Sequence, residues 1–158
     1  MQKFSKTEKS KQKVTETKTF TVPFNIKAIK ENTAIETSIT SKPSKEEIIN
    51  QAFNYHSKGN ISEATKYYQY CINQNFNDEK VFSNYGDILK NLGKLQEAEI
   101  STRKAIEINP NFAEAYSNLG NILIDLGKSQ EAENHYRKAI QLNPDYAEVH
   151  SNLGNVLK

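Results

Sequence analysis

Apolar side chains in the second part of the chain recur at the spacing of an amphipathic helix. Two such stripes follow each other between residues 113 and 142. They consist of Tyr116, Leu119 and Leu123, then Ala132, Tyr136, Ala139 and Ile140. Gly127 separates the stripes and Pro144 follows the second, at places where a helix commonly stops. The pattern therefore predicts two helices joined by a short turn.

This two-helix unit is repeated in tandem. Gly59, Gly93 and Gly127 recur every 34 residues, and the second and third units are identical at 18 of 34 positions. The units are residues 45–78, 79–112, 113–146 and a partial fourth at 147–158. A single helical pair leaves apolar surface uncovered, so neighbouring units must stack to bury it. We therefore predict an all-α solenoid of three full units and a partial fourth.

Helix starts are also signalled in the sequence. Three pairs place a capping oxygen three residues before a carboxylate, as in a capping box. These pairs are Ser44 with Glu47, Asn111 with Glu114, and Asp145 with Glu148. We expect each pair to mark the beginning of a helix.

Residues 1–44 differ in composition from the rest. They hold nine Lys, four Glu and thirteen Ser or Thr, whereas residues 45–158 hold twelve basic and fifteen acidic side chains. Such a segment buries too little apolar area to offset its chain entropy. We expect 1–44 to be a flexible, disordered basic leader ahead of a repeat domain at 45–158.

Several classes of protein are disfavoured by composition. No apolar run approaches the length of a membrane-spanning helix, and no apolar block follows the N-terminal lysines, so a cytoplasmic location without membrane insertion is expected. Cys71 is the only cysteine and replaces an alanine of the repeat, which predicts a buried packing residue. The three histidines, His56, His135 and His150, occupy unrelated repeat positions. We expect no catalysis, no metal and no cofactor.

The residues of the third unit resemble a tetratricopeptide repeat. The resemblance is carried by Asn118-Leu119-Gly120-Asn121, Gly127-Lys128, Glu131-Ala132, Tyr136-Arg137-Lys138-Ala139-Ile140 and Asn143-Pro144. It covers residues 45–158 and implies stacked helical hairpins that bind proteins. Four positions depart from the family pattern: Cys71, Phe76, Thr102 and Ser129.

Asparagine occupies the sixth position of all four units, as Asn50, Asn84, Asn118 and Asn152. Asparagine is a poor interior helix former, and its amide matches the donor and acceptor of a peptide bond. The repeats also resemble those of protein O-linked N-acetylglucosamine transferases, which implies an asparagine ladder on a concave face that grips an extended polypeptide. The flanking candidates are Ser83, Ser117, Asp87 and Asn121. The alternative is that these asparagines persist through duplication of the repeat, or bond to the backbone of neighbouring helices, and bind no ligand.

We therefore expect a non-catalytic interaction module for a protein or peptide partner. The small polar lining disfavours an acidic chaperone tail, and the dispersed leader lysines do not predict specific nucleic-acid binding. Two alternatives stay open. The array is the substrate-presenting part of a longer glycosyltransferase or other transferase, or it is a homo-oligomerisation scaffold that pairs through the uncapped C-terminal helix.

Overall fold

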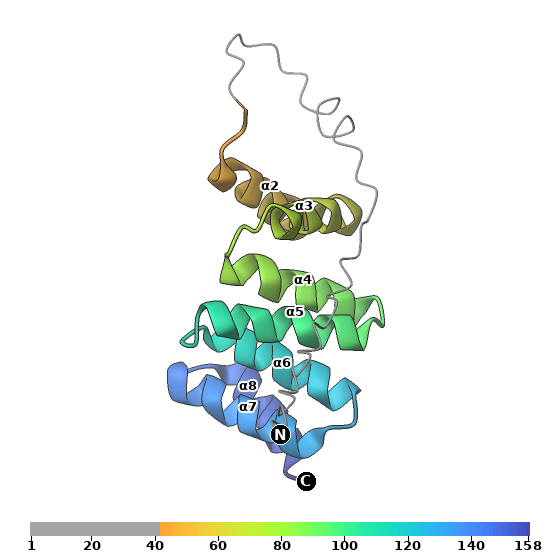
Figure 1. The fold of residues 1–158 in the computed structure, drawn as a ribbon. Coiled ribbons are helices and arrows are strands. Elements are labelled where there is room, and N and C mark those ends of the chain that lie inside the picture. Colours follow the sequence, from red (N-terminus) through yellow and green to blue (C-terminus); the bar gives the residue numbers. More distant parts are fainter. Residues whose placement is uncertain (1–41) are drawn as a thin grey trace, which may run out of the picture. The chain divides into compact units, whose positions relative to one another are not determined.

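The computed structural model describes residues 42–158, and in this part of the chain the regular elements are all helices (Figure 1). Their bounds are α2 Lys45–Ser57, α3 Ile61–Asn73, α4 Glu79–Asn91, α5 Leu95–Ile108, α6 Ala113–Asp125, α7 Ser129–Leu142 and α8 Ala147–Val156. We call α2, α4, α6 and α8 the A helices, and α3, α5 and α7 the B helices. The first three A helices each pack on the B helix that follows, and each B helix packs on the next A helix. This arrangement confirms the predicted all-α solenoid, while the predicted leader lies outside the described residues except for its last three.

Turns and caps fix where the helices begin and end. Gly59, Gly93 and Gly127 join A to B with φ between 72° and 75°, a backbone region that favours glycine. Ser44 and Glu47 form the predicted capping box of α2: the Glu47 amide donates to Ser44 Oγ at 3.2 Å and the Ser44 amide donates to Glu47 Oε2 at 2.7 Å.

The other two predicted capping pairs are wrong. The N-caps of α6 and α8 are Phe112 and Tyr146, and neither makes a side-chain capping bond. Asn111 and Asp145 lie one residue earlier, because the helices begin at Ala113 and Ala147. Sequence inspection also missed Asp78, whose Oδ1 accepts from the Val81 amide at 3.0 Å and caps α4.

Small residues let the two helices of a unit approach closely. A Cβ added to Gly120 in α6 would lie 2.6 Å from Tyr136 Cδ1 in α7, and Ala132 beside it is fully buried. The same core continues to Val149 of α8, so it crosses from the third unit into the fourth. Burial between neighbouring units therefore supplies much of the stability, as expected of a repeat protein.

Two departures from the repeat pattern are buried in the core. Cys71 is fully buried as predicted, and burial raises the pKa of its thiol to about 11, so it is a packing residue and an unreactive thiol at neutral pH. Thr102 is also fully buried where the other units carry Tyr68 and Tyr136. Its Oγ1 is the one buried side-chain polar atom within residues 42–158 that lacks a hydrogen-bond partner.

Ion pairs join the B helices of the second and third units. Lys128 Nζ lies 2.8 Å from Glu99 Oε2, and Arg103 bonds both Glu99 and Glu131. The hydrogen bond from Lys128 is the main cause that lowers the pKa of Glu99, and the bond from Arg103 does the same for Glu131. These acids therefore link the B helices of two neighbouring units.

Candidate functional site

The asparagine column lies where successive units meet. Asn118 Nδ2 in α6 donates to Ser83 Oγ in α4 at 3.0 Å, and Asn152 Nδ2 in α8 donates to Asn121 Oδ1 in α6 at 3.0 Å. Asn84 in α4 hydrogen-bonds the hydroxyl of Tyr68 in α3. These bonds tie neighbouring units together through side chains, whereas the alternative interpretation of the sequence expected bonds to helix backbone.

The amides of the column are only partly used by these internal bonds. Asn84, Asn118 and Asn152 are half-buried and Asn50 is exposed. An asparagine amide has two N–H donors and an oxygen acceptor. In the part of the chain that the structure describes, Asn118 and Asn152 each use a single N–H. One N–H and the oxygen of both residues stay available to a ligand.

The serines of the predicted site are not on the surface. Ser83 and Ser117 are each 1% exposed, which contradicts the prediction that they flank a bound peptide. Ser83 accepts the bond from Asn118, and Ser117 bonds the Tyr146 hydroxyl. Both positions turn toward the adjacent unit, so these serines orient other side chains from within the packing.

The other two flanking candidates stay half-buried. Asp87 accepts from Asn91 Nδ2 at 3.2 Å and lies 3.5 Å from Lys90 Nζ. Asn121 Oδ1 accepts from the Tyr136 hydroxyl at 2.7 Å in addition to the bond from Asn152. The two acceptor bonds leave both N–H groups of the Asn121 amide without a partner among the described residues.

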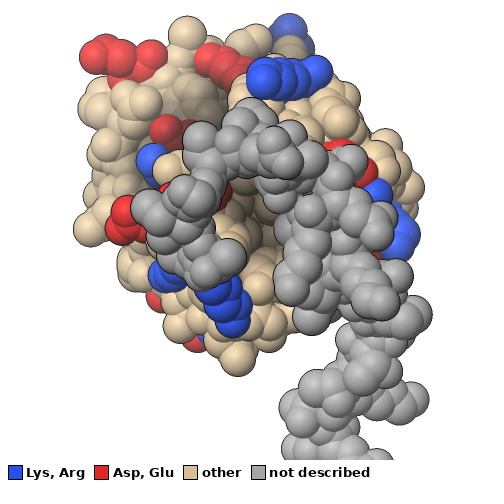
Figure 2. Space-filling model, turned by 90° about the horizontal axis from the view of Figure 1, so that it is seen from above, with Lys and Arg blue, Asp and Glu red and all other residues tan. Residues whose placement is uncertain are grey.

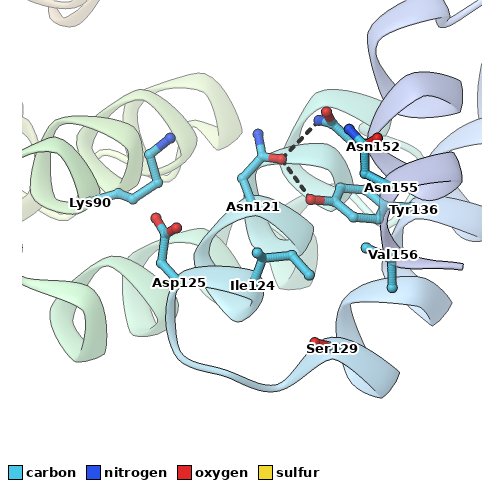
Figure 3. A pocket seen from close by; sticks show the side chains of 9 residues that line it. All are labelled: Lys90, Asn121, Ile124, Asp125, Ser129, Tyr136, Asn152, Asn155 and Val156. Carbon is cyan, nitrogen blue, oxygen red and sulfur yellow. Dashed lines mark hydrogen bonds between the residues drawn. The ribbon is translucent and has the colours of Figure 1, made fainter. Parts of the chain in front are cut away.

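Asn121 and Asn152 stand in the wall of a pocket of about 470 Å³ that residues of the second, third and fourth units line (Figure 3). In that view Lys90 and Asp125 lie on one side, and Tyr136, Asn152, Asn155 and Val156 on the other. Ile124 lies between the two groups, and Ser129 comes from the start of α7. Asp125, Tyr136, Ile124, Ser129, Val156 and Lys90 were not among the predicted site residues.

The charged side chains that line the pocket are Lys90 and Asp125. Burial raises the pKa of Tyr136 to about 12, and the charges of Asp125 and Glu148 add to that rise. The positive charge of Lys90 is offset by its pairing with Asp87. On the face drawn in Figure 2, both acidic and basic side chains are visible.

No catalytic constellation is assembled in residues 42–158. His56 Nδ1 lies 3.0 Å from the Tyr68 hydroxyl, His135 Nε2 lies 3.8 Å from Glu131 Oε1, and His150 Nε2 lies 2.8 Å from the Pro144 carbonyl oxygen. Within the same range no three His, Cys, Asp or Glu side chains converge as metal ligands. Nor does this range contain a helix with the length and apolar character needed to cross a bilayer.

Stacked antiparallel hairpins with 34-residue periodicity define the class of helical repeat proteins. Three family models described as TPR or tetratricopeptide repeat match residues 80–112, 102–134 and 120–158, and together they span 80–158. The chain belongs to the tetratricopeptide repeat family. No curated protein matches the sequence significantly.

Solved structures with the same fold share few identical residues with this chain. The first TPR of Spaghetti (RPAP3), bound to the HSP90 peptide SRMEEVD, is 22% identical with a TM-score of 0.66, over 71% of this chain and 89% of that one. The second TPR domain of human RPAP3, in complex with an HSP70 peptide, is 20% identical with a TM-score of 0.64, over 70% and 92%. A Thermobaculum terrenum O-GlcNAc transferase mutant is 21% identical with a TM-score of 0.67, over 72% of this chain and 22% of that one.

Proposed function

We propose that residues 45–158 form a non-catalytic module that binds an extended peptide segment of a protein partner along the A helices. The asparagine column supplies the recognition: each rung offers an N–H and an oxygen to one peptide unit of the ligand. As part of the same proposal, the domain begins at residue 45, it works without a cofactor, and the protein is cytoplasmic.

The observation that carries the proposal is the pair Asn121 and Asn152 in the pocket wall. Their mutual bond and the Tyr136 hydroxyl hold both amides in place, while free N–H and oxygen groups stay exposed to the pocket. Preorganised polar groups lose less conformational entropy when a ligand binds. The RPAP3 domains named above also carry bound peptides, which supports peptide binding by this fold.

Acidic chaperone tails are not the ligand that we propose. The peptide in the first RPAP3 structure, SRMEEVD, has three acidic residues. The charged residues of the pocket here are Asp125 and a lysine that already pairs with Asp87. An acidic peptide would meet an unpaired carboxylate, whereas a backbone-reading groove for neutral or basic segments fits the lining.

The proposal is tested with a decapeptide selected from a random display library against the intact protein. Methylation of single backbone nitrogens removes one donor and keeps every side chain. We expect N-methyl groups at alternating positions to weaken binding about two- to tenfold each, since a net hydrogen bond contributes about 0.5–1.5 kcal/mol. Fluorescence anisotropy measures the affinity. Equal binding of all methylated forms would contradict recognition of the peptide backbone.

A second candidate function is homo-oligomerisation through α8. A Cβ added to Gly154 would meet nothing within 4 Å, whereas Gly120 at the same repeat position is covered by Tyr136 of its B helix. Leu157 is 56% exposed beside this uncovered face. Light scattering over a dilution series tests the candidate: a mass that stays at one chain at all concentrations would exclude it.

The likeness to the repeat region of a transferase favours a related reading, in which the array presents substrates to a transferase domain. The gene sequence after the codon for Lys158 tests it. An in-frame transferase domain would support this reading, and a stop codon there would exclude it.

A further inference from the structure

Asp125 is an unpaired carboxylate at the edge of the pocket. It lies at the end of α6, and it forms no ion pair or hydrogen bond within residues 42–158. Most acids of the neighbouring helices are neutralised: Asp87 by Lys90, Glu99 by Lys128 and Arg103, and Glu133 by Arg137. Its side chain is exposed, so a ligand can reach it.

The pocket continues from this carboxylate as a partly apolar wall. Ile124 lies next to Asp125, and Val156, Asn152 and Asn155 line the far side (Figure 3). A volume of about 470 Å³ admits one long side chain together with part of a peptide backbone. Lysine and arginine combine an apolar stem with a cationic end, and they bury the stem along apolar surface while the charge finds a partner.

From this arrangement we propose that the pocket is a specificity subsite that receives a lysine or arginine side chain of the captured peptide, with Asp125 as its counter-ion. The inference rests on the proposed peptide-binding function. The stem lies against Ile124, and the cationic end lies at Asp125. The asparagines above hold the peptide backbone, so the subsite sets the register of the bound segment.

Two other occupants fit less well. An acidic side chain would have to compete with Asp87 for Lys90 and would face Asp125. A purely apolar side chain would bury the carboxylate without a partner, which is unfavourable. The negative charge of Asp125 contributes to the raised pKa of Tyr136, so its electrostatic effect reaches the other side of the pocket.

The experiment selects peptides from a random decapeptide display library against the intact protein, its Asp125→Asn variant and the control Asp145→Asn. Asp145 is an exposed acid in the turn before α8 and does not line the pocket. We expect lysine and arginine to be enriched about three- to fivefold at one position for the wild type and the control. The enrichment falls to the input level for Asp125→Asn, consistent with one partly exposed ion pair.

A thermodynamic cycle then measures the interaction between the charge of the peptide lysine and Asp125. One selected peptide is synthesised with lysine and with norleucine, which keeps the stem and removes the charge. We expect the lysine peptide to bind the wild type about three- to fivefold more tightly and both peptides to bind Asp125→Asn equally. Both peptides are compared on the same protein, so effects common to the two peptides cancel in the ratio.

The outcomes separate this inference from the proposed function. Enriched peptides without a lysine or arginine preference, or a preference that survives Asp125→Asn, would overturn the subsite and leave peptide binding intact. Failure to enrich any peptide would overturn the proposed function and the subsite with it.

Discussion

At the scale of single residues, glycine and alanine at the eighth position of each unit set the distance between A and B helices. In the first unit this residue is Ala52, which is fully buried, as is Tyr68 of the same unit. In the third unit it is Gly120, and the Tyr136 ring occupies the space that a methyl group would need. Gly154 in the fourth unit has open space at that place. One substitution therefore has opposite consequences at equivalent positions.

We predict that Gly120→Ala lowers the free energy of unfolding by about 1–2 kcal/mol, because the buried Tyr136 ring must shift. Gly154→Ala is the matched control and should raise the free energy by up to about 1 kcal/mol, since alanine is the better helix former. Urea denaturation followed by circular dichroism measures both. Equal effects of the two substitutions would contradict the packing described here.

Thr102 leads to a second prediction. Its buried Oγ1 has no partner, so Thr102→Val should raise the free energy of unfolding by about 1 kcal/mol by removing an unsatisfied polar group. Thr65→Val is the control and should lower the free energy of unfolding, because the Thr65 hydroxyl donates to the Ile61 carbonyl oxygen at 2.7 Å. Thermal unfolding of the two variants checks the pair, and a destabilised Thr102→Val would show that the hydroxyl has a partner in solution.

At the scale of elements, the bonds of Glu99 link α5 to the start of α7. Folding lowers the pKa of Glu99 below its ordinary value of 4.5, so its stabilising contribution is present above that value and is lost as the pH falls through the folded pKa. We predict that Glu99→Gln lowers the free energy of unfolding by about 0.5 kcal/mol at pH 7 and low salt, a value reduced for solvent screening.

The difference between the wild type and Glu99→Gln should shrink below pH 4.5. Glu107→Gln is the control, since Glu107 pairs with Lys104 of its own helix and links no units. Urea unfolding from pH 3 to pH 7 provides the measurement. A difference that stays constant over this range would mean that the Glu99 charge does not contribute.

The positions of most helices were predictable because the repeat combines apolar period, turn glycines and closing prolines. The starts of α6 and α8 were not, since Asn111 and Asp145 are capping residue types that lie one residue too early. Local capping patterns compete with the register that packing between units imposes. That register places Phe112 and Tyr146 at the helix starts, and residue type alone does not reveal it.

At the scale of the whole array, only part of the site followed from the sequence. The repetition of asparagine drew attention to Asn118 and Asn152, but it did not show that their amides also bond Ser83 and Asn121 in the preceding unit. Helical periodicity gives the face of a side chain only approximately, so two buried serines were placed on the surface. Asp125 and Tyr136 belong to the third unit, and only the stacking of units brings them to one pocket with Lys90 of α4 and Asn152 of α8.

The central claim is that asparagine amides of the A helices contact the backbone of a bound peptide. Two-dimensional NMR of the nitrogen-15-labelled protein reports it directly, because each asparagine side-chain amide gives its own pair of signals. On titration with a selected decapeptide, the signals of Asn118, Asn121 and Asn152 should shift, while those of Asn134, exposed on α7, should stay in place. Shifts confined to the B helices, with the column signals unmoved, would contradict the account.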